Sequence, residues 1–387
     1  MQFFSRVKEF FTSTTTIIII LAVVGVGILA SAAILIVISD FAPPAEVDIY
    51  EEYPDDTDPG IMRPPMRWDD VFLEENRFEW PASRLTGLDI YEDAYFRRPL
   101  AVVINNIHMA LPQSGITSAD IIYEVLSEGD VTRLVGIFQS DIPDKIGPVR
   151  SARDYFVDFA FNHDAIFIHH GASPGGYTRI RGSRINSFDG MAWEGILFWR
   201  DRTFPYWARN TGTRALEHSS YTGWHRIEPQ LYERGTRAII DENPAYGFAF
   251  GEITAPPAGE ASRVVVPFSP AYIRTFIFDA DTGLYLAENR DGPHLDALNQ
   301  QQLAAANILV QFTTQRVVDG EGRRTVQTIG SGSGYLVTRG NYYPLTWEKD
   351  DLTTPTRWYF EDGEPLVLSP GVTWICVFPA NGVVEFE

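Results

Sequence analysis

The residues with the most chemistry to offer lie in one stretch, KIGPVRSARDYF…IFIHHGASPGG, which spans residues 145–176. Arg150 and Arg153 precede an aromatic-rich run, and an apolar run then ends in His169 and His170. Guanidinium groups bind carboxylates and phosphates through charge-assisted hydrogen bonds, and histidine can act as a base or orient a ligand. This stretch is therefore the first candidate for a binding or catalytic site.

Ser151 followed by Asp154 predicts a helix start, because S-x-x-D is a capping pattern. Free backbone N–H groups at that start, flanked by Arg150 and Arg153, would attract a carboxylate, phosphate or sulfate. The alternative is structural, with both arginines paired to the chain's own acids. Those acids would be Asp130, Asp154 or Asp158.

His169 and His170 are neighbours in a predicted strand, so their side chains should point to opposite faces and one at most can face a given pocket. Each could be a base, a ligand-orienting group or a hydrogen-bonded structural residue. A metal site would need further ligands such as His163 and Asp164, but no zinc-type spacing is present, so no metal and no cofactor is expected. The candidate ligand-binding set is Arg150, Arg153, Ser151, His169, His170, Asp130 and Arg133.

A second candidate region lies between Arg179 and Arg237, where ten arginines accompany six acidic residues. Its segment FWRDRTFPYWARN mixes arginines with aromatic rings, a composition that can stack on sugars or bind carboxylated glycans and peptides. Pairing with an acidic second domain is the alternative. EHSSYTGWHRI contains Ser, His and Glu, but no G-x-S-x-G elbow surrounds a serine, so the pattern does not favour a serine hydrolase.

The elements that would position these groups alternate between strands and helices in the first half of the chain. Apolar runs predict buried strands at residues 98–106, 132–140 and 165–170. Helices are predicted at 117–126 and within 151–164, where Tyr, Phe and Ala side chains share one face. This alternation indicates an α/β N-terminal domain.

The second half reads as mainly β. A Gly- and Pro-containing segment marks a domain junction, and two alternating runs around DADTG predict a hairpin. One helix is expected over residues 295–307. Cys376, the chain's one cysteine, lies in an apolar strand-like run and is expected to serve as a small core hydrophobe.

Residues 17–38 carry no charge and would form a helix of about 33 Å, long enough to cross a bilayer. Basic residues precede this segment and acidic residues follow it, so the N-terminus is expected inside and the folded domains outside. A cleaved signal peptide is the alternative, because ASA at residues 30–32 resembles a cleavage site. The expected divisions are a cytoplasmic tail (1–16), a transmembrane helix (17–38), an acidic Pro-rich stalk (39–66), an α/β domain (67–243), a linker (244–262) and a mainly β domain (263–387).

The motifs resemble those of one known family. RRPLAVVINN, TSADIIYEVLSEGDVTRLVGIFQS, KIGPVRSARDYFVDFA and AIFIHHGASPGG are similar to the YerB-like family of bacterial lipoproteins, whose function is unknown. NILVQFTTQRVV and PLVLSPGVTWICVFP are similar to that family's C-terminal domain. The resemblance covers residues 84–379 and implies two domains tethered at the outer face of the membrane. Family members usually carry a lipidated cysteine, whereas this chain has none near its apolar segment.

The sequence therefore predicts a membrane-anchored extracytoplasmic envelope protein that binds an anionic or glycan-like ligand, or a protein partner, rather than an enzyme. Expected partners are the membrane, through residues 17–38, and a cell-wall glycan, a peptide or an envelope protein. The net charge of -20 excludes nucleic acid. Two alternatives stay open: a cell-wall hydrolase with His169 or His170 as base beside Asp130 or Asp154, and a scaffold for other envelope proteins.

Overall fold

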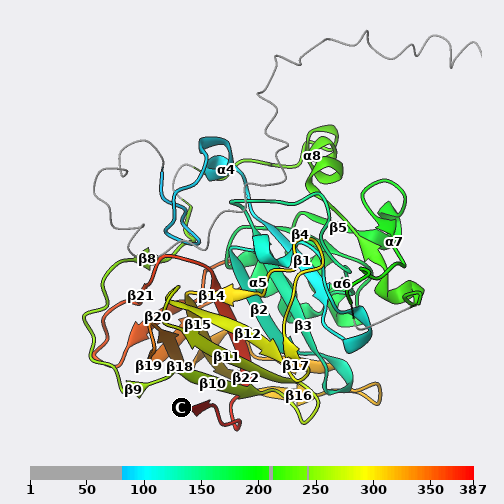
Figure 1. The fold of residues 1–387 in the computed structure, drawn as a ribbon. Coiled ribbons are helices and arrows are strands. Elements are labelled where there is room, and N and C mark those ends of the chain that lie inside the picture. The colour runs from blue at the N-terminus through cyan, green and yellow to red at the C-terminus, as the bar shows by residue number, and fades with distance from the viewer. Residues whose placement is uncertain (1–80, 209–211, 242–243) are drawn as a thin grey trace, which may run out of the picture. The chain divides into compact units, whose positions relative to one another are not determined.

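The computed structural model describes residues 81–208, 212–241 and 244–387, which all belong to one compact unit (Figure 1). The expected cytoplasmic tail, transmembrane helix and stalk, residues 1–16, 17–38 and 39–66, lie outside these ranges. None of the helices within the described ranges has the length and apolar character needed to span a bilayer.

The described chain is mostly β, with few helices. The strands of its first half are β1 (Leu100–Asn105), β2 (Ile121–Leu126), β3 (Thr132–Phe138), β4 (Ile166–His169), β5 (Ser187–Asp189), β6 (Trp199–Arg200) and β7 (Ser220–Tyr221). The helices are α4 (Glu92–Phe96), α5 (Asp154–Phe161), α6 (Pro174–Ser183), α7 (Gly190–Trp193) and α8 (Trp224–Glu233), with 3-10 turns η2 (His108–Ala110), η3 (Ile116–Ser118), η4 (Glu128–Asp130) and η5 (Leu216–His218).

The second half of the described chain adds strands only. They are β8 (Ala249–Phe250), β9 (Gly259–Glu260), β10 (Arg263–Pro267), β11 (Ile273–Asp279), β12 (Leu284–Asn289), β13 (Gly292–Pro293), β14 (Ala304–Ala305), β15 (Asn307–Thr313), β16 (Gln315–Val317), β17 (Arg324–Val326), β18 (Gly330–Thr338), β19 (Asn341–Lys349), β20 (Arg357–Phe360), β21 (Val367–Leu368), β22 (Thr373–Pro379) and β23 (Glu385–Phe386). The predicted DADTG hairpin is confirmed as β11 and β12, which pair antiparallel.

Strands from both halves form one mixed sheet of 11 strands, in the order β20-β19-β18-β15-β22-β2-β3-β1-β4-β5, with β9 paired to β19. The join is a parallel pairing of β2 with β22, in which Ile121 faces Thr373 and Val125 faces Val377. The segments before and after residues 244–262 therefore share a single hydrogen-bonded sheet.

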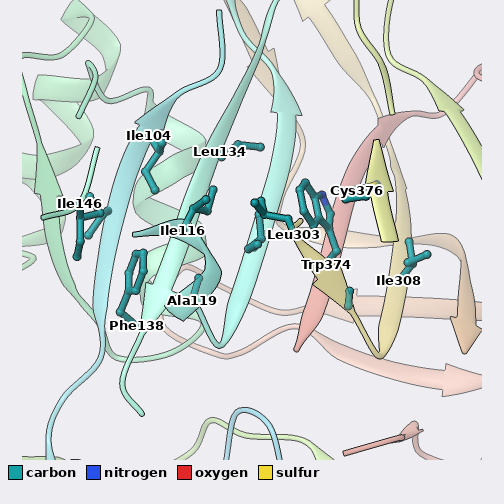
Figure 2. Packing of buried hydrophobic residues seen from close by; sticks show 14 of the residues in the cluster. Ile104, Ile116, Ala119, Leu134, Phe138, Ile146, Leu303, Ile308, Trp374 and Cys376 are labelled. Atoms are coloured by element: carbon teal, nitrogen blue, oxygen red, sulfur yellow. The ribbon is translucent and has the colours of Figure 1, made fainter. Parts of the chain in front are cut away.

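A six-stranded antiparallel sheet, built around β10, β11 and β12, packs on one face of the large sheet. Figure 2 shows part of this core, where Ile104 and Leu134 lie in the same cluster as Trp374 and Ile308 from the other half. Burial of so many apolar side chains is the main favourable contribution to folding. The core crosses the β2–β22 join without interruption.

Helix α5 covers the opposite face of the large sheet. Tyr155, Phe156 and Phe159 are buried there against strand residues such as Val103 and Phe167. These aromatic positions recur one helical turn apart, which is why the sequence already predicts this helix and its buried face. The helix within 151–164 and the strands at 98–106, 132–140 and 165–170 are thus confirmed.

The helix predicted at 117–126 is wrong, because residues 121–126 form strand β2. β2 lies between β3 and β22 and is buried on both faces, so its side chains show no polar–apolar alternation. Asp120 does not start a helix. Its carboxylate instead accepts hydrogen bonds from the backbone N–H groups of Gln139 (2.6 Å) and Ser140 (2.9 Å).

The helix predicted over residues 295–307 is also wrong. Asp296 is fully buried, and its carboxylate accepts hydrogen bonds from the backbone N–H groups of Gly115 and Thr117, each at 3.0 Å. Gln300 adopts a φ of 60°, which is incompatible with a right-handed helix. Long-range hydrogen bonds to the other half of the chain thus override the helical composition.

The reactivity of the Cys376 thiol tests whether β22 is buried inside the sheet. Its side chain is 0% exposed, and burial raises the pKa of the thiol well above its usual value. We expect no reaction with a disulfide reagent such as DTNB at pH 8 in the native chain, and one reacting thiol per chain in guanidinium chloride, because the thiolate is the reactive form. Rapid labelling of the native protein would show that β22 is not buried between β2 and β15.

Candidate functional site

The strand ends that carry the candidate residues meet at one edge of the large sheet. β1 pairs parallel with β4, and both β1 and β2 pair antiparallel with β3. β1, β2 and β4 therefore run in the same direction, and their carboxyl ends lie at the same edge, where open α/β sheets commonly bind ligands. His169 ends β4 at this edge, and Arg133 lies at the start of β3.

The backbone around Arg150 is fixed at this edge by hydrogen bonds to both neighbouring strands. The Arg150 N–H donates to the Val103 carbonyl (2.8 Å), and the His170 N–H donates to the Arg150 carbonyl (3.1 Å). The backbone of Arg150 is thus held between β1 and the end of β4, next to His170.

Arg133 and Arg153 share a single carboxylate, that of Glu128. Arg153 donates to Glu128 Oε2 from Nε (3.0 Å) and Nη2 (2.5 Å), and Arg133 donates to Oε1. Both guanidinium groups are nearly buried, with side chains 4% and 8% exposed. Burial, reinforced by the neighbouring Arg153 charge, lowers the pKa of Arg133 to about 9. Although burial opposes them, the two arginines hold the pKa of the Glu128 carboxyl below its usual range.

Arg150 extends this group toward solvent. Its side chain is half-buried, and among the described residues its hydrogen bond is to the backbone carbonyl of Glu217, at 3.3 Å from Nη1. Burial lowers the pKa of Arg150, and the charges of Arg153 and Arg200 lower it further, while Glu128 and Glu217 act against them. Two guanidinium groups therefore bind the Glu128 carboxylate, and the third, that of Arg150, interacts with it electrostatically from farther away. We name Arg133, Arg150, Arg153 and Glu128 the arginine cluster.

His170 is held as a neutral ring in one tautomer. Arg200 Nη2 donates to His170 Nε2 (2.8 Å), so Nδ1 carries the proton and donates to Ser220 Oγ (2.8 Å). Burial and then the Arg200 charge lower the pKa of His170. Nδ1–H cannot also accept the Ser220 proton, and Ser220 is only 1% exposed, so this contact does not make Ser220 a nucleophile.

His169 points to the other face, as the strand alternation predicts. Its ring packs against Phe167, whereas that of His170 packs against Phe198. His169 Nδ1 donates to the Gly171 carbonyl (2.9 Å), and its buried Nε2 has no partner among the described residues. Burial lowers its pKa as well.

Ser151 does not cap the helix, so this detail of the prediction is wrong. The N-cap position of α5 belongs to Arg153, without a side-chain cap, and the Ser151 carbonyl instead accepts from Arg133 Nη1 (2.6 Å). The backbone of residues 151–153 bends along the loop after β4, where Ala152 bridges to Ala172. The serine therefore contributes its main chain to the arginine cluster.

Asp130 and Asp158, two of the acids considered as partners of Arg150 and Arg153, pair with other arginines. Asp130 is exposed and forms an ion pair with Arg324. Asp158 is buried and pairs with Arg179 (2.8 Å). Burial raises the pKa of Asp154 at the start of α5. Among the described residues, the structure records no hydrogen bond or ion pair between Asp130 or Asp154 and the two histidines.

His163 and Asp164 precede β4 and so lie at its opposite end from His169 and His170. His163 is buried, with Nε2 against the Tyr123 hydroxyl (2.8 Å), and the Asp164 carboxylate pairs with Arg98 and Arg237. In the part of the chain that the structure describes, no group of three or more His, Cys, Asp or Glu side chains is placed to hold a metal ion.

Several arginines in the Arg-rich region between Arg179 and Arg237 contact aromatic rings of the chain itself. Arg226 lies over the Trp199 ring (4.9 Å) and Arg234 over the Trp193 ring (4.9 Å). One face of each of these two rings is thus covered by a guanidinium group of the chain itself, whereas Tyr206 in the same region is 94% exposed.

Glu128, Arg200 and Glu217 complete the site, although sequence reasoning did not single them out as ligand-binding residues. Glu128 lies two residues after the end of β2, and an expectation of a strand there would have placed it at the ligand-binding edge. Arg200 and Glu217 lie in the segments FWRDRTFPYWARN and EHSSYTGWHRI, but only their long-range contacts show that they belong to this site.

Comparison with known proteins places the chain in a family. The family described as "Protein of unknown function (DUF3048)" matches through its N-terminal domain at residues 85–237 and through its C-terminal domain at residues 264–375. The chain belongs to the DUF3048 family. A protein of Bacillus subtilis (strain 168) named "Putative lipoprotein YerB" is 33% identical over 300 residues, which is 76% of this chain and 85% of that protein.

The crystal structure of the YerB protein from Bacillus subtilis superposes with a TM-score of 0.68 at 30% identity, and the match covers 79% of this chain and 99% of that one. The resemblance to YerB-like proteins is therefore confirmed. The two DUF3048 segments lie on either side of the β2–β22 join, with β2 in the first segment and the first three residues of β22, 373–375, in the second.

His163 makes the stability of this DUF3048 protein depend on pH. Burial and the nearby Lys349 charge lower its pKa to about 3, whereas an unfolded histidine titrates near 6.5. The unfolded chain takes up the proton first as pH falls, so folding stability is lost below about pH 6.5. We expect a loss of up to about 2 kcal/mol from this residue at pH 5.

Urea unfolding at pH 7.5 and pH 5 measures this loss. The His163→Gln variant should show a smaller difference between the two pH values than the wild type. Equal pH dependence in His163→Gln and the wild type would mean that His163 is not buried as a neutral ring.

Proposed function

We propose that this protein is anchored at the outer face of the cytoplasmic membrane and binds an anionic ligand at the arginine cluster. The anchoring is supported by the uncharged segment 17–38, by the distribution of charges around it, and by the name of the relative as a lipoprotein. The segment lies outside the described residues, so the means of attachment rests on the sequence alone.

The observation that carries the binding proposal is the excess of positive charge in the arginine cluster. Arg133 and Arg153 share the one carboxylate of Glu128, and the positive charge of Arg150 lies close enough to interact with both Arg153 and Glu128, in a chain whose overall net charge is -20. Like charges held close together in a partly buried setting repel one another strongly. A bound carboxylate or phosphate would relieve this repulsion, and Arg150, with its one carbonyl hydrogen bond, has donors left to bind it.

Binding without catalysis is better supported than hydrolysis. A base must accept a proton from the reacting group, but both nitrogens of His170 are occupied by Arg200 and Ser220. His169 has a free Nε2, yet this atom is buried away from solvent. Neither histidine therefore has the geometry of an accessible base.

Arg150→Ala tests the proposed site. We expect citrate or inorganic phosphate, added to the full-length protein in detergent at constant ionic strength, to raise the melting temperature of the wild type. Ligand at about 100 times its Kd adds about 2.7 kcal/mol of stability. Arg150→Ala should lose this rise, while Arg316→Ala, which removes an exposed arginine on β16, should keep it. An equal rise in all three proteins, or none in the wild type, would contradict the proposal.

Glu128→Gln tests the role of the shared carboxylate. It leaves Arg133 and Arg153 without their counter-charge, so we expect a loss of about 2–4 kcal/mol in the free energy of unfolding. Added phosphate should stabilise this variant more than the wild type, because the arginine cluster then has one more positive charge without a counter-charge. Urea unfolding with and without phosphate measures both effects. A stability equal to that of the wild type would show that the ion pairs contribute little.

A further inference from the structure

A cavity of about 410 Å³ opens on the face of the large sheet opposite the arginine cluster. Glu124 lines it, and Glu124 is paired in register with Leu134, the neighbour of Arg133 on β3. Adjacent strand residues point to opposite faces, so the cavity and the arginine cluster lie on different sides of the same sheet edge. The cavity also lies between the two halves of the chain, because Tyr272 and Arg274 come from the start of β11.

An ion pair between Glu124 and Arg274 lines the cavity. Arg274 Nε donates to Glu124 Oε2 (2.8 Å) and Nη2 donates to Oε1 (3.3 Å), and both side chains are only 2% exposed. The guanidinium group lies over the Trp374 ring, 4.8 Å from its centre. Burying two charges costs desolvation energy that their attraction offsets only with good geometry, so stability alone is a weak reason to have such a pair here.

Glu124 and Arg274 can each form further hydrogen bonds. Glu124 Oε1 accepts from Asn106 Nδ2 (3.3 Å) and Thr132 Oγ1 (2.8 Å) besides Arg274, whereas Oε2 accepts from Arg274 Nε alone among the described residues. Each carboxylate oxygen can accept two hydrogen bonds, and Nη2 carries two N–H groups of which one is used. One acceptor site on Glu124 Oε2 and one N–H of Arg274 Nη2 therefore remain unused among the described residues.

The charges that line the cavity balance. Two acids, Glu124 and Asp291, are matched by two arginines, Arg274 and Arg290. Asp291 lies 3.0 Å from His108 Nδ1, across the boundary between β12–β13 and the segment after β1. The side chain of Tyr272 is half-buried and supplies an aromatic surface. A ligand that suits these surroundings carries no net charge and has both hydroxyl groups and an apolar face.

We propose that this cavity binds a neutral polyhydroxylated ligand, a sugar residue. One hydroxyl would donate to Glu124 Oε2, a neighbouring hydroxyl would accept from Arg274 Nη2, and the C–H face of the ring would lie against Tyr272. The volume falls within the range of about 300–1,000 Å³ that is usual for small-molecule sites. This site is independent of the arginine cluster and of the proposed binding of an anion there.

Saturation-transfer difference NMR on the full-length protein tests the proposal, in a detergent without a sugar headgroup. The probes are glucose, N-acetylglucosamine and the β-1,4-linked trimer of N-acetylglucosamine. We expect transfer to the ring protons of at least one probe in the wild type, and an affinity at least tenfold lower in Tyr272→Ala. Tyr272→Phe should retain binding, because it keeps the aromatic ring. Tyr232→Ala, at a site on α8 that is 73% exposed, is the matched control and should also retain binding.

The probes and variants separate the outcomes. Tighter binding of the trimer than of the monomers identifies a glycan chain as the source of the sugar, and equal binding identifies a free sugar. Absence of transfer to all three probes, or equal affinity in Tyr272→Ala and the wild type, overturns the proposal. Arg150→Ala should leave the sugar signal unchanged, and Tyr272→Ala should leave the effect of phosphate on the melting temperature unchanged. The two binding proposals are therefore tested separately, and one can be overturned without the other.

Discussion

Strand β2 pairs in parallel with β22, and this pairing makes one sheet of two chain segments that a Gly- and Pro-containing stretch separates in the sequence. Both strands are buried on both faces, so their backbone groups have no water to bond with and depend on each other. Glu124 lies opposite Cys376 in this register, and its carboxylate reaches Arg274 in the second sheet. β2 thus connects the helices of the first half with both sheets of the second.

The same strand explains why polar groups gather at one edge. β2 ends just before Glu128, and β3 begins with Thr132 and Arg133 on opposite faces. Thr132 donates to Glu124 on the cavity side, whereas Arg133 reaches Glu128 on the side of α5. A single turn of the chain therefore supplies residues to both candidate sites, which lie on opposite faces of the sheet.

Local patterns were sufficient for part of this arrangement. The apolar run of β4 and the aromatic face of α5 follow from spacing alone, and alternation correctly separates His169 from His170. The family resemblance rested on similar local motifs. Where the sequence-based prediction is wrong, contacts with distant residues determine the structure. Residues 121–126 form a strand because they pair with β22. The segment 295–307 is not helical, and its Asp296 carboxylate binds the backbone N–H groups of Gly115 and Thr117.

The candidate site, like the fold, could be predicted from the sequence only in part. Arg150 and Arg153 could be selected because they lie next to each other in an unusual motif, but their charge environment depends on Glu128 and Glu217, which no spacing rule connects to them. The ion pair of the cavity joins residues 150 positions apart. The position of β22 has a further consequence for biogenesis. A chain made from its N-terminus completes β2 long before β22 is synthesised, so one edge of a central strand stays unpaired until almost all of the described chain is available, and it is open to wrong partners during that interval.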